Sequence, residues 1–300
     1  MQPTTIICVV GPTAAGKTGL SIELAKHFQG EIVSADSRQV YRGLDIGTAK
    51  VTATEMQGIP HHLIDVVDID TIYTGSDFIR DADAAIRDID ARNALPIVAG
   101  GTFFYVQLLR RAIAPAPAPP NPELRESFAH HNNKTLFALL QQKDSIRAAT
   151  IDPHNRRRLV RALEIIDHLG TVPPQSPPPS PYRSIMVGID SDKDTLRNKY
   201  RTRSLDWLQA GITQEVDTLL TNGISREHLK EIGFEYELVL QLLDDELTET
   251  EYIERFIQKN WQYAKRQRTW MYKDPDITWF TPGTTPEIIE HITQKLQTNT

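Results

Sequence analysis

The sequence predicts an α/β fold, in which a parallel sheet is flanked by helices and a small all-helical domain interrupts the chain. Short apolar runs alternate with stretches of helical periodicity, a pattern typical of the β–α units that build parallel sheets. The expected strands are 6–10, 31–35, 95–99, 185–189 and 277–280. Two proline-rich segments, 114–122 and 172–181, separate the third strand from the fourth. Because such segments cannot continue a helix, they mark the ends of an insert.

Helical patterns at 135–142 and 155–169 lie between these segments and favour a folded domain over a low-complexity linker. We therefore expect a core of residues 1–118 and 184–300 and an inserted helical domain of residues 119–183. The main helices of the core are expected after a Ser76 cap, over 192–210, after a capping box formed by Thr248 and Glu251, and from about Pro286.

Composition and charge exclude several classes of protein. With 300 residues and 40% hydrophobic content, the chain can bury one large core, or a core and a smaller domain. No run approaches the roughly eighteen apolar residues that a membrane span requires. The first strand begins almost at Met1 and contains Cys8, the only cysteine, so we expect no signal peptide, no disulfide and a cytoplasmic protein. The net charge of −6 argues against indiscriminate nucleic-acid binding but allows a local basic surface.

The first strand runs directly into a glycine-containing loop that is followed by a helical pattern. Its residues are Gly11, Pro12, Thr13, Ala14, Ala15, Gly16, Lys17 and Thr18. This arrangement of strand, G-x-x-x-x-G-K-T loop and helix is the P-loop, whose backbone N–H groups cradle phosphate. Lys17 adds a positive charge, and the Thr18 hydroxyl is the usual first ligand for Mg²⁺. The sequence therefore predicts a P-loop NTPase-like core with a phosphate site at this loop.

Polar side chains also follow two other expected strands. Asp36 comes after the second strand, and Gly100, Gly101 and Thr102 come after the third. The carboxyl ends of parallel strands meet at one edge of a sheet, so these groups are expected near the P-loop. Locally, an Asp that caps a turn and a tight turn with an exposed Thr explain the same residues equally well.

His61 and His62 are adjacent in the sequence, which raises the question of a metal site. Neighbouring residues on a strand point to opposite faces, and no third ligand stands at a zinc-like spacing. We expect structural or substrate-contact roles for them.

The helix over 192–210 contains an arginine on its apolar arc. Leu196, Tyr200 and Trp207 define that arc, and Arg203 falls inside it at 3.6 residues per turn. An inward arginine is costly unless an anion meets it. Three interpretations remain open: Arg203 closes over the phosphate of the P-loop, extends its guanidinium to solvent, or pairs with a buried carboxylate.

The densest positive run of the chain, 156–161, lies in the insert. Leu159 falls on the apolar face of the expected helix, and Arg157 and Arg161 fall on the opposite face. Two interpretations remain open: a solvated face paired to Glu164, or a contact with nucleic-acid phosphates, which the arginine fork fits well.

Six blocks, in order along the chain, resemble the tRNA isopentenyltransferase family, which comprises the tRNA dimethylallyltransferases. They read GPTAAGKT, ADSRQVYRGLDIGTAK, HHLID, GGT, DPHNRRRLVRALE and AKRQRTW. The resemblance implies a P-loop core with an inserted helical domain that grips the anticodon arm. It also implies transfer of a prenyl group from dimethylallyl diphosphate to N6 of the adenine that is 3′-adjacent to the anticodon in tRNA.

The resemblance also implies roles for individual residues. Asp36, Thr102, Lys17 and Arg203 are expected to be catalytic, with Asp36 as the base, and the loop Gly11 to Thr18 with Arg203 to bind diphosphate. Mg²⁺ is the expected cofactor, with Thr18 as its ligand. The expected tRNA contacts are Asp36, Ser37, Arg38, Gln39, Thr102, Arg125, Arg157, Arg158, Leu159, Val160 and Arg161. We expect a monomer without a membrane partner.

Three residues depart from the family pattern. Phe103 replaces a small residue after Gly-Gly-Thr, Lys199 stands where arginine is common, and Glu235 stands where basic residues are common. Glu235 would repel a phosphate, so no tRNA contact is expected there. Two other functions remain alternatives: prenylation of free adenine nucleotides, which would not need the insert, and a small-molecule P-loop kinase.

Overall fold

In a computed structural model, the chain forms two compact units. The structure describes residues 3–113, 118–173 and 179–298, so 114–117 and 174–178 of the two proline-rich segments lie outside the described residues. Unit 1 comprises Met1–Arg110 with Ser180–Thr300, and unit 2 comprises Arg111–Pro179. The expected second boundary was placed too late, because Tyr182 and Arg183 already pair with Thr4 and Thr5 in the sheet.

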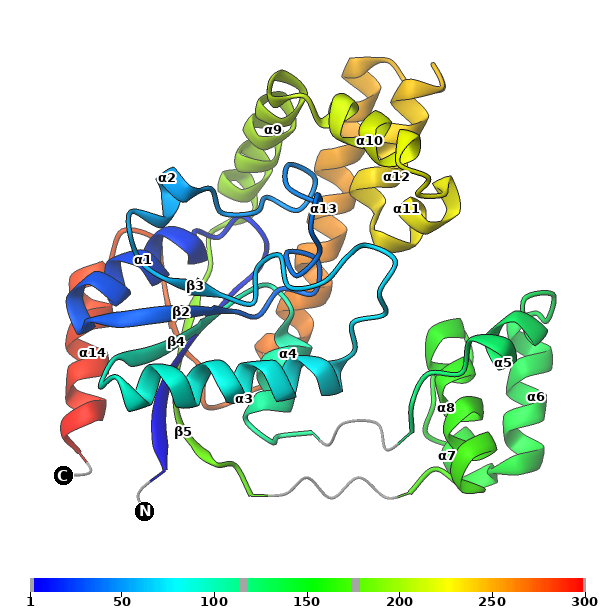
Figure 1. The fold of residues 1–300 in the computed structure, drawn as a ribbon, viewed down its shortest axis with the longest axis horizontal. Coiled ribbons are helices and arrows are strands. Elements are labelled where there is room, and N and C mark those ends of the chain that lie inside the picture. Colours follow the sequence, from blue (N-terminus) through cyan, green and yellow to red (C-terminus); the bar gives the residue numbers. More distant parts are fainter. Residues whose placement is uncertain (1–2, 114–117, 174–178, 299–300) are drawn as a thin grey trace. The chain divides into compact units, whose positions relative to one another are not determined.

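Unit 1 is built on a parallel sheet whose strand order is β3-β2-β4-β1-β5-β6 (Figure 1). Its strands are β1 (Thr4–Val10), β2 (Gly30–Ser34), β3 (His61–His62), β4 (Leu95–Ala99), β5 (Tyr182–Ile189) and β6 (Thr278–Phe280). The central strand β1 lies in register with both neighbours, with Ile7 opposite Ile97 of β4 and Ile185 of β5. The predicted α/β class with a parallel sheet is confirmed, and the carboxyl ends of β1, β2 and β4 lie together at one edge.

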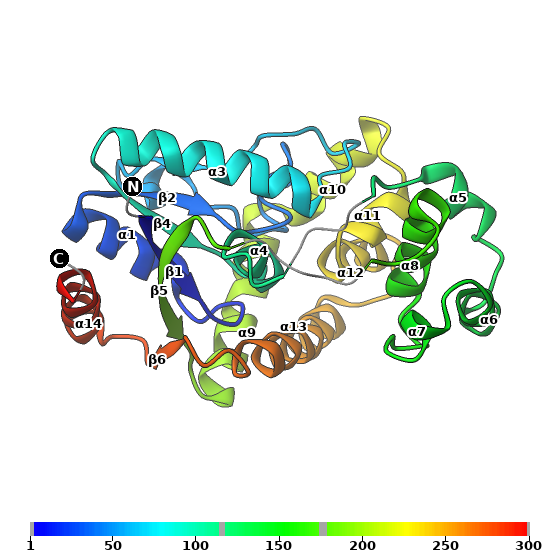
Figure 2. The same ribbon diagram turned by 90° about the horizontal axis from the view of Figure 1, so that it is seen from below.

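Helices cover both faces of this sheet. Those of the first half of unit 1 are α1 (Lys17–Phe28), α2 (Ala53–Met56), α3 (Gly75–Ala91) and α4 (Phe103–Leu109), and α14 (Thr285–Gln297) ends the unit. α1 and α14 pack with the sheet in one apolar cluster, which includes Leu24 and Ile292. α3 lies against the opposite face (Figure 2), where Phe78 stacks on Tyr105 of α4.

A second apolar cluster forms beyond the carboxyl edge of the sheet. It joins α9 (Lys193–Ala210), α10 (Ile212–Thr221), α11 (Arg226–Ile232), α12 (Phe234–Leu243) and α13 (Glu249–Met271). Its largest buried side chains include Tyr200, Tyr236 and Phe256. This cluster holds α9 and α13 side by side, and both helices reach back toward the P-loop.

The ends of the helices test the capping residues that the sequence predicts. Thr248 and Glu251 form the predicted capping box at α13, and Gly211 ends α9 in the left-handed region, with a φ of 92°. The expectation that Ser76 caps α3 was wrong. Thr74 is the cap, because its side chain and that of Asp77 satisfy each other's backbone N–H groups.

Unit 2 is a small helical domain with a core of its own. Its helices are α5 (Pro122–Ser127), α6 (Asn133–Lys143), α7 (Ser145–Ala148) and α8 (Arg156–Leu169). Leu136, Leu140, Leu159 and Leu163 form the centre of this core. Among the described residues of both units, no helix has the length and apolarity that crossing a bilayer would demand.

Candidate active site

The P-loop is shaped by two glycines, one of which is required by a close contact and the other by its backbone conformation. At Gly11, a Cβ atom would lie 2.1 Å from the carbonyl oxygen of Ile189 in β5, and φ is 156°. Gly16 has a φ of 104° and directly precedes α1, in a conformation that favours glycine. The backbone therefore curls from β1 into the amino end of α1, which is the geometry of an anion site.

Lys17 and Thr18 carry the reactive side chains of this loop. The Lys17 ammonium donates a hydrogen bond to the carbonyl oxygen of Pro12 at 2.8 Å. Burial lowers its pKa to about 8, against the attraction of the Asp36 carboxylate, so the charged form gains from an additional anion. Thr18 is exposed, and its side chain faces the same pocket.

Asp36 follows β2 and is oriented by its own loop. Its Oδ1 atom accepts hydrogen bonds from the N–H groups of Arg38 at 2.9 Å and Gln39 at 3.3 Å. The local interpretation, an aspartate that caps a turn, is therefore correct, and the same carboxylate also lines the pocket. Both roles are compatible, because these two hydrogen bonds engage Oδ1 only.

The loop after β4 is joined directly to the Asp36 loop. Gly100 lies so close to β2 that a Cβ atom would be 2.1 Å from the carbonyl oxygen of Ala35. Thr102 accepts a hydrogen bond from the Ser37 N–H at 3.0 Å and donates one to the Ser37 hydroxyl at 3.2 Å. The Thr102 side chain is therefore fixed beside Asp36 and does not point freely into solvent.

Arg203 points inward from α9, as its place on the apolar arc predicts. Its guanidinium donates a hydrogen bond to the Thr13 hydroxyl at 3.2 Å, and the Tyr200 hydroxyl donates to the Thr13 carbonyl at 3.3 Å. Burial lowers the pKa of Arg203, because the charged guanidinium is partly removed from water. Arg203 forms no ion pair with any residue of 3–113, 118–173 or 179–298, so its buried charge faces the P-loop without a partner carboxylate.

Gln267 of α13 is the main site residue that the sequence did not reveal. Its Oε1 atom accepts the Thr13 N–H at 2.9 Å, and its Nε2 atom donates to the Gly101 carbonyl at 2.9 Å. Gln267 is buried and stands between Ala264 and Met271 on the inward face of α13. The signal in the sequence that could have revealed Gln267 is a polar residue at a position that helical periodicity places on the buried face.

These elements enclose a pocket of about 1000 Å³, which is large enough for a small organic diphosphate. The predicted catalytic residues Lys17, Asp36, Thr102 and Arg203 all line it. Of the remaining predicted residues of unit 1, Thr13, Ala14, Gly16, Thr18, Ser37, Arg38 and Gln39 line it too. Gly11, Pro12 and Ala15 are buried in the turn of the P-loop.

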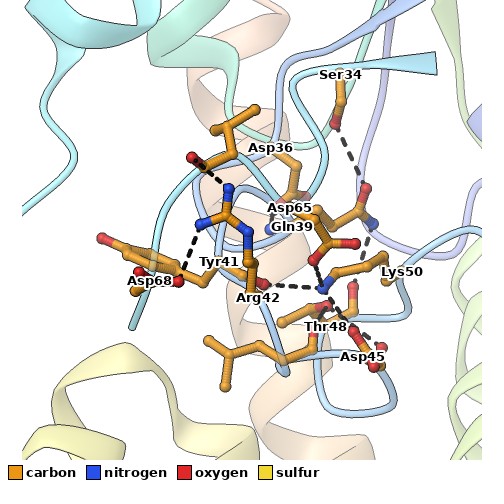
Figure 3. A network of polar contacts seen from close by, with 12 residues as sticks. Ser34, Asp36, Gln39, Tyr41, Arg42, Asp45, Thr48, Lys50, Asp65 and Asp68 are labelled. Atoms are coloured by element: carbon orange, nitrogen blue, oxygen red, sulfur yellow. Dashed lines mark hydrogen bonds and ion pairs between the residues drawn. The ribbon is translucent and has the colours of Figure 1, made fainter. Parts of the chain in front are cut away.

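The segment after Asp36 folds back on itself through a buried lysine (Figure 3). The Lys50 ammonium donates hydrogen bonds to the Tyr41 carbonyl at 2.8 Å and to the carboxylates of Asp45 and Asp65, at 2.6 and 2.5 Å. Gln39 adds hydrogen bonds from its side-chain amide to the carbonyls of Thr48 and Ala49. Residues 36–50 therefore form one internally bonded wall of the pocket.

This wall is fastened to α10 by a carboxylate. Glu215 accepts hydrogen bonds from the N–H groups of Asp45, Ile46 and Gly47 at 2.6 to 3.1 Å. The Tyr236 hydroxyl donates a further one at 2.9 Å. Three successive N–H groups form a natural anion site, which here holds a side chain of the protein itself.

The basic residues of the insert fall into two groups. Arg157 and Arg158 are exposed on α8. Arg125 of α5 and Arg161 of α8 contact the Glu164 carboxylate at 2.7 and 2.9 Å. The Glu164 carboxylate is fully buried. The predicted pairing of the α8 face with Glu164 is therefore present for Arg161, and Arg125 of α5 adds a second guanidinium. Leu159 was wrongly assigned to RNA contact: its side chain is 0% exposed, because it fills the core of unit 2. Val160 is half-buried.

The histidines and the departures from the family pattern have clear local environments. His62 contacts Glu31 at 2.7 Å and His61 contacts the Ile59 carbonyl at 2.8 Å. Within the described ranges no group of three or more His, Cys, Asp or Glu residues is placed to hold a metal. Phe103 is buried edge-on against Trp270, and Lys199 lines the pocket.

Comparisons with known proteins agree with this geometry. A sequence profile described as IPP transferase matches residues 39–274. The chain is 36% identical to the tRNA dimethylallyltransferase of Macrococcus caseolyticus, over 100% of this chain and 97% of that protein. It is 37% identical to the tRNA dimethylallyltransferase of Thermomicrobium roseum, over 97% of this chain and 92% of that protein.

Solved structures show the same similarity. The tRNA isopentenylpyrophosphate transferase of Bacillus halodurans superposes with a TM-score of 0.73 at 35% identity, and the match covers 98% of this chain and 97% of that one. A eukaryotic dimethylallyltransferase acting on tRNA gives a TM-score of 0.80 at 27% identity, covering 98% of this chain and 77% of that one. The chain therefore belongs to the IPP transferase family.

Proposed function

We propose that this protein transfers a dimethylallyl group from dimethylallyl diphosphate to tRNA, at N6 of the adenine that is 3′-adjacent to the anticodon, and releases diphosphate. Its relatives are named tRNA dimethylallyltransferases, and a similar solved structure is that of a dimethylallyltransferase acting on tRNA. One observation carries the proposal for this chain: a carboxylate, Asp36, faces the same pocket as a P-loop and an unpaired inward arginine, Arg203.

The diphosphate end of the reaction belongs to the P-loop. When the bond between the prenyl carbon and oxygen breaks, its electron pair leaves with the diphosphate, which gains negative charge. Backbone N–H groups at the amino end of α1, the Lys17 ammonium and the Arg203 guanidinium stabilise that charge. Both cations are half-buried, so their attraction for the leaving group is less screened than it would be on an open surface.

Mg²⁺ fits this end of the pocket. Mg²⁺ prefers oxygen ligands, keeps several of its waters, and is commonly held by few protein groups together with substrate phosphates. The exposed Thr18 hydroxyl at the start of α1 provides such a ligand beside the P-loop. When bound there, Mg²⁺ would neutralise part of the charge on the diphosphate.

The acceptor end belongs to Asp36 and Thr102. The exocyclic amine of adenine is a weak nucleophile, and a base that takes its proton as the new C–N bond forms lowers the barrier. Asp36 takes that proton, and the hydrogen bonds to Oδ1 from Arg38 and Gln39 leave Oδ2 for it. Thr102 holds the Ser37 backbone beside the base. The target adenine must leave its stack to enter the pocket.

The insert is the proposed holder of the anticodon arm. Arg157 and Arg158 present positive charge on the surface of α8, and Glu164 orders Arg125 and Arg161 on the same unit. Such a surface binds phosphates although the whole chain carries a net charge of −6. We also propose that the enzyme works as a monomer in the cytoplasm, where tRNA is modified.

Incubation with labelled dimethylallyl diphosphate tests the proposed function. With Mg²⁺ and unmodified tRNA, label is expected to enter the adenine next to the anticodon, and none is expected to enter AMP. Label in AMP but not in tRNA would instead identify a nucleotide prenyltransferase. Transfer of phosphate from ATP to a hydroxyl substrate, without prenyl transfer, would identify a kinase.

Replacement of Arg203 separates the diphosphate end from the RNA end. Arg203→Ala is expected to lower kcat/KM for dimethylallyl diphosphate roughly 100-fold or more, because a fixed cation aimed at the leaving group is lost. The Kd for tRNA, measured by filter binding, should change less than about twofold. Arg201→Ala, on the exposed side of α9, is the matched control. Equal losses in diphosphate use and tRNA binding would contradict this role.

The salt dependence of tRNA binding tests the basic surface of the insert. The double variant Arg157→Ala/Arg158→Ala is expected to weaken tRNA binding and to reduce the slope of log K against log salt by about 1 to 2, as phosphate contacts are lost. Transfer to a saturating concentration of tRNA should stay within about threefold of wild type. Lys134→Ala/Lys143→Ala in α6, which also removes two exposed positive charges, serves as a charge-matched control. Unchanged affinity and slope would show that these arginines are solvated surface only.

A further inference from the structure

An ion pair lies in the wall of the pocket, directly beside the proposed base. The Arg38 guanidinium contacts the Glu235 carboxylate at 2.6 Å, and the two side chains are only 25% and 10% exposed. Arg38 is two residues beyond Asp36, whereas Glu235 stands in the first turn of α12. Both residues line the pocket. The pair therefore links the Asp36 loop to a helix residue that is 197 residues away in the sequence.

The space for this pair is provided by Gly233. A Cβ atom at that position would lie 2.6 Å from Cζ of Arg38 and 2.6 Å from Oε2 of Glu235. The φ of Gly233 is 175°, which any residue adopts, so the requirement is for room and not for backbone freedom. The Arg38 guanidinium thus packs directly against the backbone of the α11–α12 turn.

The groups around Arg38 favour its ion pair with Glu235. The attraction of Glu235, with smaller contributions from Tyr263 and Asp36, outweighs burial and raises the pKa of Arg38. A buried ion pair is costly to break on one side only, because the remaining charge is left in a poorly solvated place. Arg38 is therefore held in one position and is not a mobile surface cation.

The position of Arg38 matters because of its backbone. Its N–H group makes the shorter of the two hydrogen bonds to Oδ1 of Asp36, at 2.9 Å, and the Gln39 N–H makes the other, at 3.3 Å. A shift of Arg38 would therefore rotate the carboxylate of the proposed base. Displacements of this kind, of about 1 Å, can cost roughly 100-fold in rate.

We propose that Glu235 is a positioning residue, which acts through Arg38 to hold the Asp36 carboxylate in line with the incoming amine. This inference rests on the proposed function. It reassigns Arg38: the guanidinium stays bound to Glu235 during the reaction and does not leave it for a tRNA phosphate. Glu235, which departs from the family pattern, thereby gains a role in the same reaction.

Glu235→Gln tests this inference, because it removes the charge and keeps the shape of the side chain. We expect kcat for transfer to tRNA to fall about 10- to 100-fold. The KM for dimethylallyl diphosphate and the Kd for tRNA should stay within about twofold. Hydrogen exchange of the N–H groups in 36–39 should become faster relative to those of β1. Glu237→Gln is the matched control, since Glu237 is in the same helix and pairs with Lys259 outside the pocket at 3.1 Å.

A double-mutant cycle shows whether Glu235 acts through Arg38. Arg38→Gln, Glu235→Gln and the double variant should lose similar factors in kcat, and the double variant should be the most stable of the three to heat, because it leaves no unpaired buried charge. If the losses in kcat of the two single variants multiply in the double variant, the inference is overturned. A gain in kcat/KM for tRNA in Glu235→Gln would also overturn it, because it would mean that the pair withholds Arg38 from RNA. Unchanged exchange at 36–39 also contradicts it, whereas an inactive wild type contradicts only the proposed function.

Discussion

Gln267 spans the two loops from which the pocket is built, and the spacing of the reacting groups depends on it. One end of its amide accepts from the P-loop at Thr13, and the other donates to the loop after β4 at Gly101. The sheet alone brings these loops to the same edge, but loops are mobile unless something fixes them. Because Gln267 belongs to a long helix packed against α9, it also ties the pocket to the cluster that holds Arg203. The cations that face the leaving group, Lys17 and Arg203, and the proposed base Asp36 are thus held at fixed positions relative to one another.

Carboxylates that accept several hydrogen bonds or bind a guanidinium recur within each unit. Glu215 holds the turn at Asp45–Gly47, Glu235 holds Arg38, and Glu164 holds two arginines of the insert. In each case a carboxylate with little solvent exposure is satisfied by several donors or by a guanidinium, which is the condition for burying it at low cost. Glu235 and Glu164 thereby hold the guanidinium groups that they contact in fixed positions. The unpaired inward position of Arg203 is the exception, and it faces the P-loop.

Much of the fold could be predicted from local patterns. Apolar runs identified β1, β2, β4, β5 and β6 but missed the short strand β3 at His61–His62. The glycines and Lys17 identified the P-loop, and helical periodicity placed Arg203 on the inward side. Residues whose role depends on contacts distant in sequence could not be found this way. Gln267 and the Arg38–Glu235 pair become visible only when α12 and α13 pack near the Asp36 loop. Leu159, which the resemblance placed among the tRNA contacts, has a side chain that fills the core of unit 2, as its position on the apolar face of the helix predicts.

The central claim is that the P-loop holds a diphosphate that leaves intact. The phosphorus products of a single turnover, resolved by ³¹P NMR and compared with the prenyl groups found in tRNA, test it most directly. The account predicts one intact diphosphate for each prenyl group transferred, and none when tRNA is omitted. Release of inorganic monophosphate in step with transfer, or of diphosphate at the same rate without tRNA, would contradict it.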